Sequence, residues 1–232
     1  MKASPDISCV VPAYNGERFI AEALDSLIAQ TLTPLEIIVM DDGSTDRTAE
    51  IVREYGPPVV YVHQANAGAA TARNRGVEKS RGAFVAFLDA DDIAIPERLE
   101  LQMERFRARP ELQVSLARVE NFWEDELRAE MVLLGDHAIT RPRSGTVTQA
   151  GLVRREILES IRFDPALVIC HDSDWQLRAE EVQTAIEVIP EILVRRRMHG
   201  SSLIHSGREV FQRDQLLMIK KALDRRRSAP GS

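Results

Sequence analysis

Short, uninterrupted apolar runs alternate with helix-forming segments up to Leu88, and this alternation restricts the fold more than any other feature of the chain. A strand buried on both faces of a parallel sheet is a continuous apolar run, whereas a half-exposed strand alternates apolar and polar residues. Ile7–Val11 fits the first description, Leu35–Met40 is predicted as a second buried strand, and Val59–Val62 and Ala83–Leu88 are predicted as the third and fourth strands. The intervening segments carry apolar residues at helical spacing or helix-capping residues. We therefore predict an α/β fold with a mostly parallel, Rossmann-like central sheet flanked by helices.

The second half of the chain has a weaker pattern. We predict strands at Val114–Val119 and Thr184–Ile189, and helices at Thr148–Ile161 and His171–Glu181. Beyond residue 207 apolar side chains predict an amphipathic helix packed on the body: Val210, Leu216, Leu217, Ile219 and Leu223. A disordered tail from Arg225 to the end is expected after this helix. The predicted organisation is one domain over residues 1–207 and a C-terminal helix with its tail over residues 208–232.

Composition and charge restrict the class of protein. The chain has 232 residues and a net charge of −6, which argues against general nucleic-acid affinity. Residues 195–232 nevertheless hold ten Lys and Arg against three Asp and Glu. This basic end either meets an anionic partner, such as a membrane surface, or is a solvated helix face.

Features of targeting and redox chemistry are sparse. Cys9 and Cys170 stand alone, which predicts two core thiols and suits a reducing compartment. The first apolar run is too short for a signal region, and no apolar run reaches the length of about 18 residues that a membrane span needs. We therefore expect a cytoplasmic protein, with contact at the inner face of the membrane left open.

Polar and turn-forming residues come directly after three of the predicted strands, at Pro12–Asn15, Asp41–Gly43 and Asp89–Asp92. Ligands of open parallel sheets bind beyond the carboxyl ends of the strands, so these segments predict the binding site. Asp89 and Asp91 are two residues apart and point to one side of an extended chain. Two carboxylates without a neighbouring His or Cys suit Mn²⁺ or Mg²⁺ better than zinc. The D-x-D spacing alone is a weak signal, and its place after a buried strand strengthens it.

Five segments, in order and spacing, resemble the family 2 glycosyltransferases: Ile7–Gly16, Val39–Asp46, Asn66–Gly68, Ala72–Gly76 and Phe87–Asp92. The resemblance implies a GT-A fold. In that fold about residues 5–100 would bind a nucleotide sugar, and about residues 110–200 would form a smaller acceptor-binding part.

The resemblance also implies roles for individual residues. It implies that the nucleoside, the ribose and the phosphates are contacted by a set of polar and aromatic residues and one proline: Pro12, Tyr14, Asn15, Asp41, Asp42, Arg73, Asn74 and Asp89. For the metal it implies Asp91 and Asp89, with His199 of the late Arg-x-His segment near the metal and diphosphate. Purely structural roles remain as alternatives: a strand-to-helix turn for Asp41 and Asp42, a surface ion pair for Arg73, and an exposed loop position for His199.

On the acceptor side, members of the family carry a Glu-Asp pair, and a helix that contains a Leu-Arg pair follows it. This chain has His171-Asp172 at the pair, so Asp172 is the implied general base and His171 departs from the family pattern. A carboxylate suits the role because it is ionised at neutral pH. Asp174 is the alternative base, and an N-cap role is the alternative for Asp172. Trp175 either stacks on a sugar or lies in the core.

The sequence thus predicts an inverting glycosyltransferase that moves a hexosyl or N-acetylhexosaminyl group from a nucleoside-diphosphate sugar, by default a UDP-sugar. The acceptor would be a glycan or lipid-linked hydroxyl, as in polysaccharide biosynthesis. A divalent metal, Mn²⁺ or Mg²⁺, would assist departure of the diphosphate. The alternatives are a non-catalytic nucleotide-sugar-binding module and a nucleotidyltransferase. The latter is disfavoured because the first strand is not succeeded by a Gly-rich phosphate loop. The oligomeric state stays open.

Overall fold

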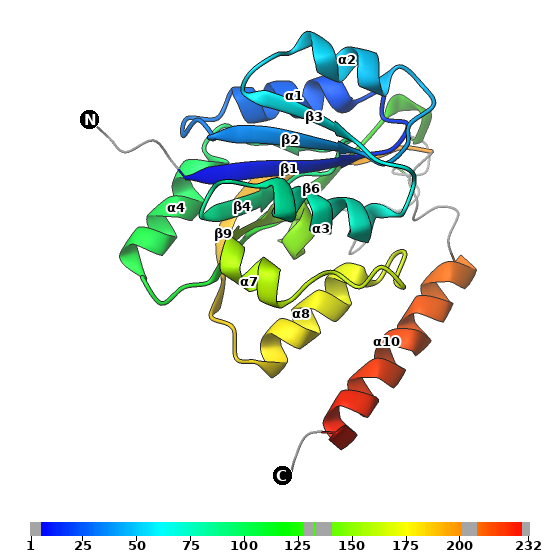
Figure 1. The fold of residues 1–232 in the computed structure, drawn as a ribbon. Helices are drawn as coiled ribbons and strands as arrows, with labels where there is room; N and C mark the ends of the chain where they lie inside the picture. Colours follow the sequence, from blue (N-terminus) through cyan, green and yellow to red (C-terminus); the bar gives the residue numbers. More distant parts are fainter. Residues whose placement is uncertain (1–5, 128–131, 133–140, 201–207, 229–232) are drawn as a thin grey trace.

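The computed structural model describes residues 6–127, 132, 141–200 and 208–228, and Figure 1 traces their path. The elements run in the order β1 (Ile7–Ala13), α1 (Ile20–Ile28), β2 (Glu36–Asp41), α2 (Thr48–Glu54), β3 (Val59–His63), α3 (Ala69–Lys79), β4 (Phe84–Phe87), β5 (Ile93–Ala94), α4 (Arg98–Ala108), β6 (Val114–Trp123), η1 (Asp125–Leu127), β7 (Arg143–Ser144), α6 (Val147–Ala150), β8 (Gly151–Arg154), α7 (Arg155–Ser160), α8 (His171–Glu181), β9 (Ile186–Met198) and α10 (Arg208–Ser228).

One mixed sheet forms the centre of the described part of the chain. Its strand order is β3-β2-β1-β4-β8-β6-β9-β5, and β7 pairs with β6 beside this path. The first four strands are parallel, as predicted from the alternation of strands and helices. Strand β8 then runs antiparallel between β4 and β6, while β6 and β9 are parallel to each other. The predicted α/β fold is confirmed, and its antiparallel pairings lie in the half where the sequence pattern was weak.

Helices cover both faces of the sheet (Figure 1). Apolar side chains of α1, α2 and α4 share one core cluster with the sheet, including Leu24, Val52 and Phe106. Side chains of α3, α7 and α8 share the other, including Ala72 and Trp175. On the second face α3 lies close to β1, because a Cβ at Gly76 would come within 2.3 Å of a Val10 methyl. The two cysteines are buried and free, as predicted.

The predicted helix over Thr148–Ile161 is wrong. The structure instead has the short helix α6, the strand β8 and the helix α7 in this stretch. Gly151–Val153 is fully buried between β4 and β6, so sheet pairing outweighs helical propensity there. Both strands predicted nearby exist but are longer: β6 continues to Trp123, and β9 continues to Met198.

The C-terminal helix α10 extends to Ser228 and therefore includes Arg225, where a disordered tail was expected. Residues 229–232 lie outside the described part of the chain. Asp214 is fully buried and accepts the backbone N–H groups of Val168 and Ile169, each at 2.7 Å. The apolar side chains that were expected to face the body divide between two faces: Leu217 is half-buried, whereas Leu216, Ile219 and Leu223 are exposed. Among the described helices, none has the length and apolar content that a membrane crossing requires.

Candidate active site

The loops at the carboxyl ends of β1, β2 and β4 meet at one edge of the sheet. Asn15 adopts a left-handed backbone with φ of 50°. Its amide N–H donates to Ser44 Oγ at 2.9 Å, and its Oδ1 accepts from Thr45 N at 2.9 Å. An added Cβ at Gly16 would lie 3.7 Å from the Cβ of Ala90 in the third loop. The strand ends that the sequence placed together therefore lie together.

Residues of β1 and its loop differ in access. Pro12 is half-buried in β1, whereas Asn15 is exposed in the loop. Tyr14 is 56% exposed, so its ring is free to stack on a planar ligand. These three residues lie at the carboxyl end of β1, and the contact with a nucleoside that the resemblance implied for them stays a prediction.

Asp41 and Asp42 are both buried where β2 ends. Burial works to raise the pKa of Asp41, but hydrogen bonds from Ser44 and Tyr61 outweigh it and hold that pKa below its usual range. Asp42 accepts hydrogen bonds from Gln64 Nε2 and from the backbone N–H groups of residues 67 and 68. Both carboxylates thus organise the strand-end loops. Their contact with a nucleotide base also stays a prediction.

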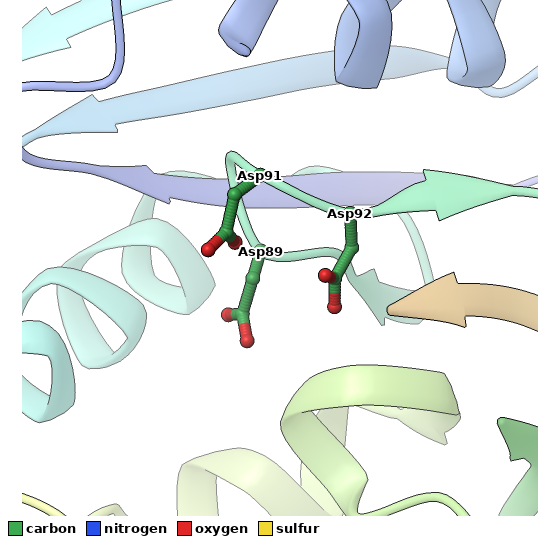
Figure 2. Close-up of side chains that lie close together, drawn as sticks. All are labelled: Asp89, Asp91 and Asp92. Carbon is green, nitrogen blue, oxygen red and sulfur yellow. The ribbon is translucent and has the colours of Figure 1, made fainter. Parts of the chain in front are cut away.

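Three carboxylates stand together on the connection between β4 and β5. Figure 2 shows Asp89, Asp91 and Asp92 pointing to the same side of this loop, and one oxygen from each lies within 4.8 Å of the others. The sequence named the first two for metal binding and missed Asp92. Asp92 comes directly after Asp91 in the chain, so a count of neighbouring carboxylates could have found it.

The acidic cluster fits a divalent cation. Oxygen ligands of a single Mg²⁺ at about 2.1 Å lie at most about 4.2 Å apart, so small side-chain rotations would complete the set. Burial and the charges of Asp91 and Asp89 raise the pKa of Asp92 well above its usual range. Within the described residues, the buried Oδ2 of Asp92 has no hydrogen-bond partner. A carboxylate that is buried, crowded by like charges and left with one unpartnered oxygen is stabilised by a bound cation.

Arg73 of α3 connects the acidic cluster to the second half of the chain. Its Nη2 forms an ion pair with Asp89 Oδ1, and its Nη1 lies 2.8 Å from His171 Nε2. Burial and the charge of Arg73 lower the pKa of His171 to about 4, so the ring is neutral and accepts the guanidinium hydrogen bond. Arg73 is therefore buried in the site and is not a surface ion-pair residue. His171, which departs from the family pattern, is its acceptor.

Asp172 lies at the start of α8, within electrostatic range of the acidic cluster. Burial raises the pKa of Asp89, Arg73 opposes this rise, and the charges of Asp91 and Asp172 add to it. Asp172 Oδ2 accepts from Thr146 Oγ1 at 2.9 Å and from Thr148 Oγ1 at 2.6 Å. Its Oδ1 is buried and has no partner among the described residues. One oxygen is thus fixed and the other is left for a ligand.

The neighbouring candidates have structural roles. Asp174 is buried and forms ion pairs with Arg178 at 2.7 Å and with Arg225 at 3.8 Å, so each of its oxygens lies near an arginine of the protein itself. Trp175 is 1% exposed and donates to a backbone carbonyl, which places it in the core and not against a sugar. The side-chain amide of Asn74 bonds both the carbonyl and the N–H of Phe163 and is occupied by the protein itself.

Comparison with known families now settles which family this is. Residues 8–162 match the model described as Glycosyl transferase family 2. This chain is a family 2 glycosyltransferase domain. It is 46% identical over 106 residues to the uncharacterized glycosyltransferase YibD of Escherichia coli, covering 44% of this chain and 31% of that protein. It is 30% identical over 222 residues to the uncharacterized glycosyltransferase EpsJ of Bacillus subtilis, covering 86% of this chain and 63% of that protein.

Solved structures confirm the fold. S. aureus TarS 1–349 in complex with UDP-GlcNAc superposes with a TM-score of 0.72 at 23% identity. The match covers 91% of this chain and 65% of that chain. The family 2 domain described here thus spans less than two thirds of these curated relatives and of the matched structure. The likeness to TarS supports the predicted GT-A arrangement.

The family 2 domain brings a late strand to its acidic cluster. His199 is buried, with its Nε2 2.9 Å from Asp91 Oδ2 and its ring 4.7 Å from that of Phe19. It is therefore not an exposed loop histidine, and its metal contact stays a prediction. Arg197 donates its backbone N–H to Asp92 Oδ1 at 3.0 Å and its Nε to the Asp91 carbonyl at 2.9 Å.

Three residues of the site were not found from the sequence. Asp92 completes the cluster, while Thr146 and Thr148 hold Asp172. Each threonine lies more than twenty residues from Asp172 along the chain, in a stretch without a clear pattern. No short-range motif marks them, because only the packing of α6 against α8 brings them to Asp172.

Proposed function

We propose that this chain is the transferase domain of an inverting enzyme. It would move a hexosyl or N-acetylhexosaminyl group from a nucleoside-diphosphate sugar to an acceptor hydroxyl. The observation that carries the proposal is Asp172. This carboxylate has one oxygen fixed by two hydroxyl groups and the other unpartnered among the described residues, and it lies within electrostatic range of the acidic cluster. Membership of glycosyl transferase family 2 supports the proposed reaction class.

The donor is proposed to be a UDP-sugar. TarS, which shares the fold, has been solved in complex with UDP and with UDP-GlcNAc. In this chain the strand-end loops around Tyr14, Asn15 and Asp42 would take the nucleoside. Arg73 would stand beside the diphosphate, because it already pairs with Asp89.

A divalent metal, Mn²⁺ or Mg²⁺, would be held by Asp91 and Asp89, with Asp92 and His199 next to them. When bound, it supplies positive charge that neutralises the leaving diphosphate. His171 keeps Arg73 oriented toward Asp89, and Arg197 fixes the loop through the Asp91 carbonyl and Asp92. These contacts hold the carboxylates in place before a donor arrives.

In the proposed transfer, Asp172 Oδ1 accepts the proton of the acceptor hydroxyl. The hydroxyl oxygen forms its bond to the anomeric carbon from the face opposite the diphosphate, and the bond from that carbon to the diphosphate oxygen breaks. The bonding electrons leave with the diphosphate, so the configuration inverts without a covalent enzyme intermediate. Thr146 and Thr148 hold the carboxylate in position, since both donate to its other oxygen.

A non-catalytic nucleotide-sugar-binding module is the rival function. A screen of nucleotide sugars with Mn²⁺ by thermal shift identifies the donor, because a ligand that binds the folded state raises its apparent stability. Hydrolysis of that donor is then measured for the wild type and for Asp91→Ala. We expect slow hydrolysis by the wild type and none by the variant. Donor binding without any hydrolysis or transfer would favour the module.

The location is proposed to be cytoplasmic, with α10 contacting an anionic membrane that carries the acceptor. Leu216, Ile219 and Leu223 recur at helical spacing and are exposed, and Arg226 and Arg227 are exposed near the end of the same helix. Apolar side chains beside basic ones suit the surface of an anionic bilayer. Vesicles that contain phosphatidylserine should carry the wild type upward in a flotation gradient and should leave an Ile219→Ser variant behind. Equal flotation of both, or of neither, contradicts this contact.

A further inference from the structure

Two arginines, Arg143 and Arg196, share one face of the sheet. In β7, Arg143 stands opposite Val119 of β6. On the other side of β6, Val194 of β9 is the partner of the same Val119, and Arg196 comes two residues later opposite Asn121. Residues opposite one another, and residues two apart, project from the same face of a sheet. The two strands are two strand spacings apart, or about 10 Å, which leaves room for a small group between their side chains.

Neither guanidinium is neutralised by the part of the chain that the structure describes. Both arginines are half-buried, and neither forms an ion pair with a described carboxylate. Arg143 makes only long contacts, with the Ser144 carbonyl and Gln149 Oε1, each at 3.4 Å. The adjacent arginines of β9 differ, since Arg195 pairs with Glu120, and Arg197 pairs with Glu22 and Glu124.

Arg143, one of the two arginines, lies close to the proposed base. Arg143 begins the segment that also carries Thr146 and Thr148, the two hydroxyl groups that hold Asp172. Burial and the positive charge of Arg196 lower the pKa of Arg143, while the charges of Asp92 and Asp172 oppose that change. Arg143 thus lies within electrostatic range of Arg196, Asp92 and Asp172. Two unneutralised cations at a partly desolvated position are stabilised by an anion.

We propose that Arg143 and Arg196 bind a phosphate group of the acceptor, next to the hydroxyl that Asp172 deprotonates. This inference rests on the proposed function and adds the chemical class of its acceptor. Guanidinium groups match phosphate oxygens through paired hydrogen bonds, which favours phosphate as the anion. The donor diphosphate has its own groups at Arg73 and the acidic cluster. The acceptor would thus be a phosphorylated polyol or sugar, or a lipid-linked glycan phosphate.

The experiment measures binding of glycerol 1-phosphate to the protein saturated with UDP and Mg²⁺, with glycerol as the uncharged probe. Titration calorimetry at low salt compares the wild type with Arg143→Gln, Arg196→Gln and the matched control Arg195→Gln. The control removes a neighbouring charge from the opposite face of the same strand. We expect glycerol 1-phosphate to bind the wild type and the control alike, and to bind each test variant about tenfold more weakly. UDP affinity should stay unchanged in all of them.

Three outcomes would overturn the inference. Equal binding of glycerol 1-phosphate to the wild type and to both test variants removes the pair as a phosphate site. The same holds if the wild type binds neither glycerol 1-phosphate nor phosphatidylcholine vesicles that carry a polyprenyl phosphate. A loss of UDP affinity in the test variants would show that the arginines bind the donor and not the acceptor. Failure of the wild type to bind UDP at all would instead contradict the proposed function.

The two wild-type ligands distinguish the two sources of phosphate. Tighter binding to the polyprenyl phosphate vesicles than to glycerol 1-phosphate supports the pair as a site for a lipid-linked acceptor. Saturation by glycerol 1-phosphate alone supports it as a site for a soluble phosphorylated acceptor. In both cases the Arg143→Gln and Arg196→Gln variants must lose the preferred ligand.

Discussion

The proposed donor side and the proposed acceptor side of the site are built in different ways. On the donor side, the acidic cluster begins just past the end of β4, and Asn15 and Ser44 bond across adjacent strand-end loops. On the acceptor side, Asp172 is held by hydroxyl groups 24 and 26 residues away in the chain. The donor side is thus determined by where parallel strands stop, whereas the acceptor side depends on long-range packing. This contrast implies that the two sides can be impaired separately.

The largest separation is expected from Asp172→Asn. An amide retains the size of the side chain but cannot accept the proton, so the transfer rate should fall by about 10³-fold. The donor affinity, measured by titration of UDP with Mn²⁺, should stay within about twofold because no donor contact is removed. Retained transfer would exclude Asp172 as the base, and Asp174→Asn provides the matched control for an acidic residue of the same helix.

A smaller effect is expected at the contact that joins the two sides. His171 is neutral when folded, with a pKa of about 4 against about 6.5 in an unfolded chain. Between those values the unfolded state binds more protons, so the stability that depends on neutral His171 is complete above pH 6.5 and is lost as the pH falls toward 4. The loss is about 1.4 kcal/mol per pH unit, or about 2 kcal/mol between pH 7 and pH 5.

The His171→Gln variant isolates this effect, because glutamine offers Arg73 an acceptor oxygen and does not titrate. Denaturant unfolding of both proteins at pH 7 and pH 5 measures the difference. Between pH 7 and pH 5, the free energy of unfolding should fall by about 2 kcal/mol more in the wild type than in the variant. The raised pKa values of Asp89 and Asp92 act in the opposite direction, but they act in both proteins. Parallel losses would show that His171 is not the neutral acceptor of Arg73.

The smallest effect is expected at Thr148, whose hydroxyl is 2.6 Å from Asp172 Oδ2. Thr148→Val keeps the shape and removes the donor, which should lower kcat about tenfold and leave the KM for the donor unchanged. Thr148→Ser should recover most of the lost rate. If valine also weakens donor binding, the acceptor side is not independent of the donor side.

The sequence predicted most of the donor side because the determining signals are short. A buried parallel strand is a continuous apolar run, and the residues directly beyond its carboxyl end form the site. The positions of β1, β2 and β4 and the cluster at Asp89 and Asp91 came from that rule. Asp92 was missed because its role depends on the turn of the loop, and the backbone N–H of Arg197 that fixes it comes from β9.

The acceptor side was less predictable because its pairing is distant in the chain. Residues Gly151–Arg154 have no strand signature of their own and become β8 only because β4 and β6 provide partners on both sides. The resemblance to a known family, not a local pattern, pointed to Asp172. The threonines that hold it and the facing Arg143 and Arg196 became visible only once the sheet register was known.

The most direct test of the account is the metal dependence of UDP binding. Titration calorimetry compares the wild type, Asp91→Ala and the control Asp6→Ala, which removes an exposed carboxylate just before β1. Each protein is titrated with UDP in Mn²⁺ and again in EDTA. The wild type and the control should bind UDP at least about tenfold more tightly with Mn²⁺ than without it, and Asp91→Ala should show no such gain. Two results would contradict a metal-diphosphate site at the Asp89–Asp92 loop. One is a wild-type UDP affinity that is the same with and without Mn²⁺, and the other is a UDP affinity of Asp91→Ala that still depends on Mn²⁺.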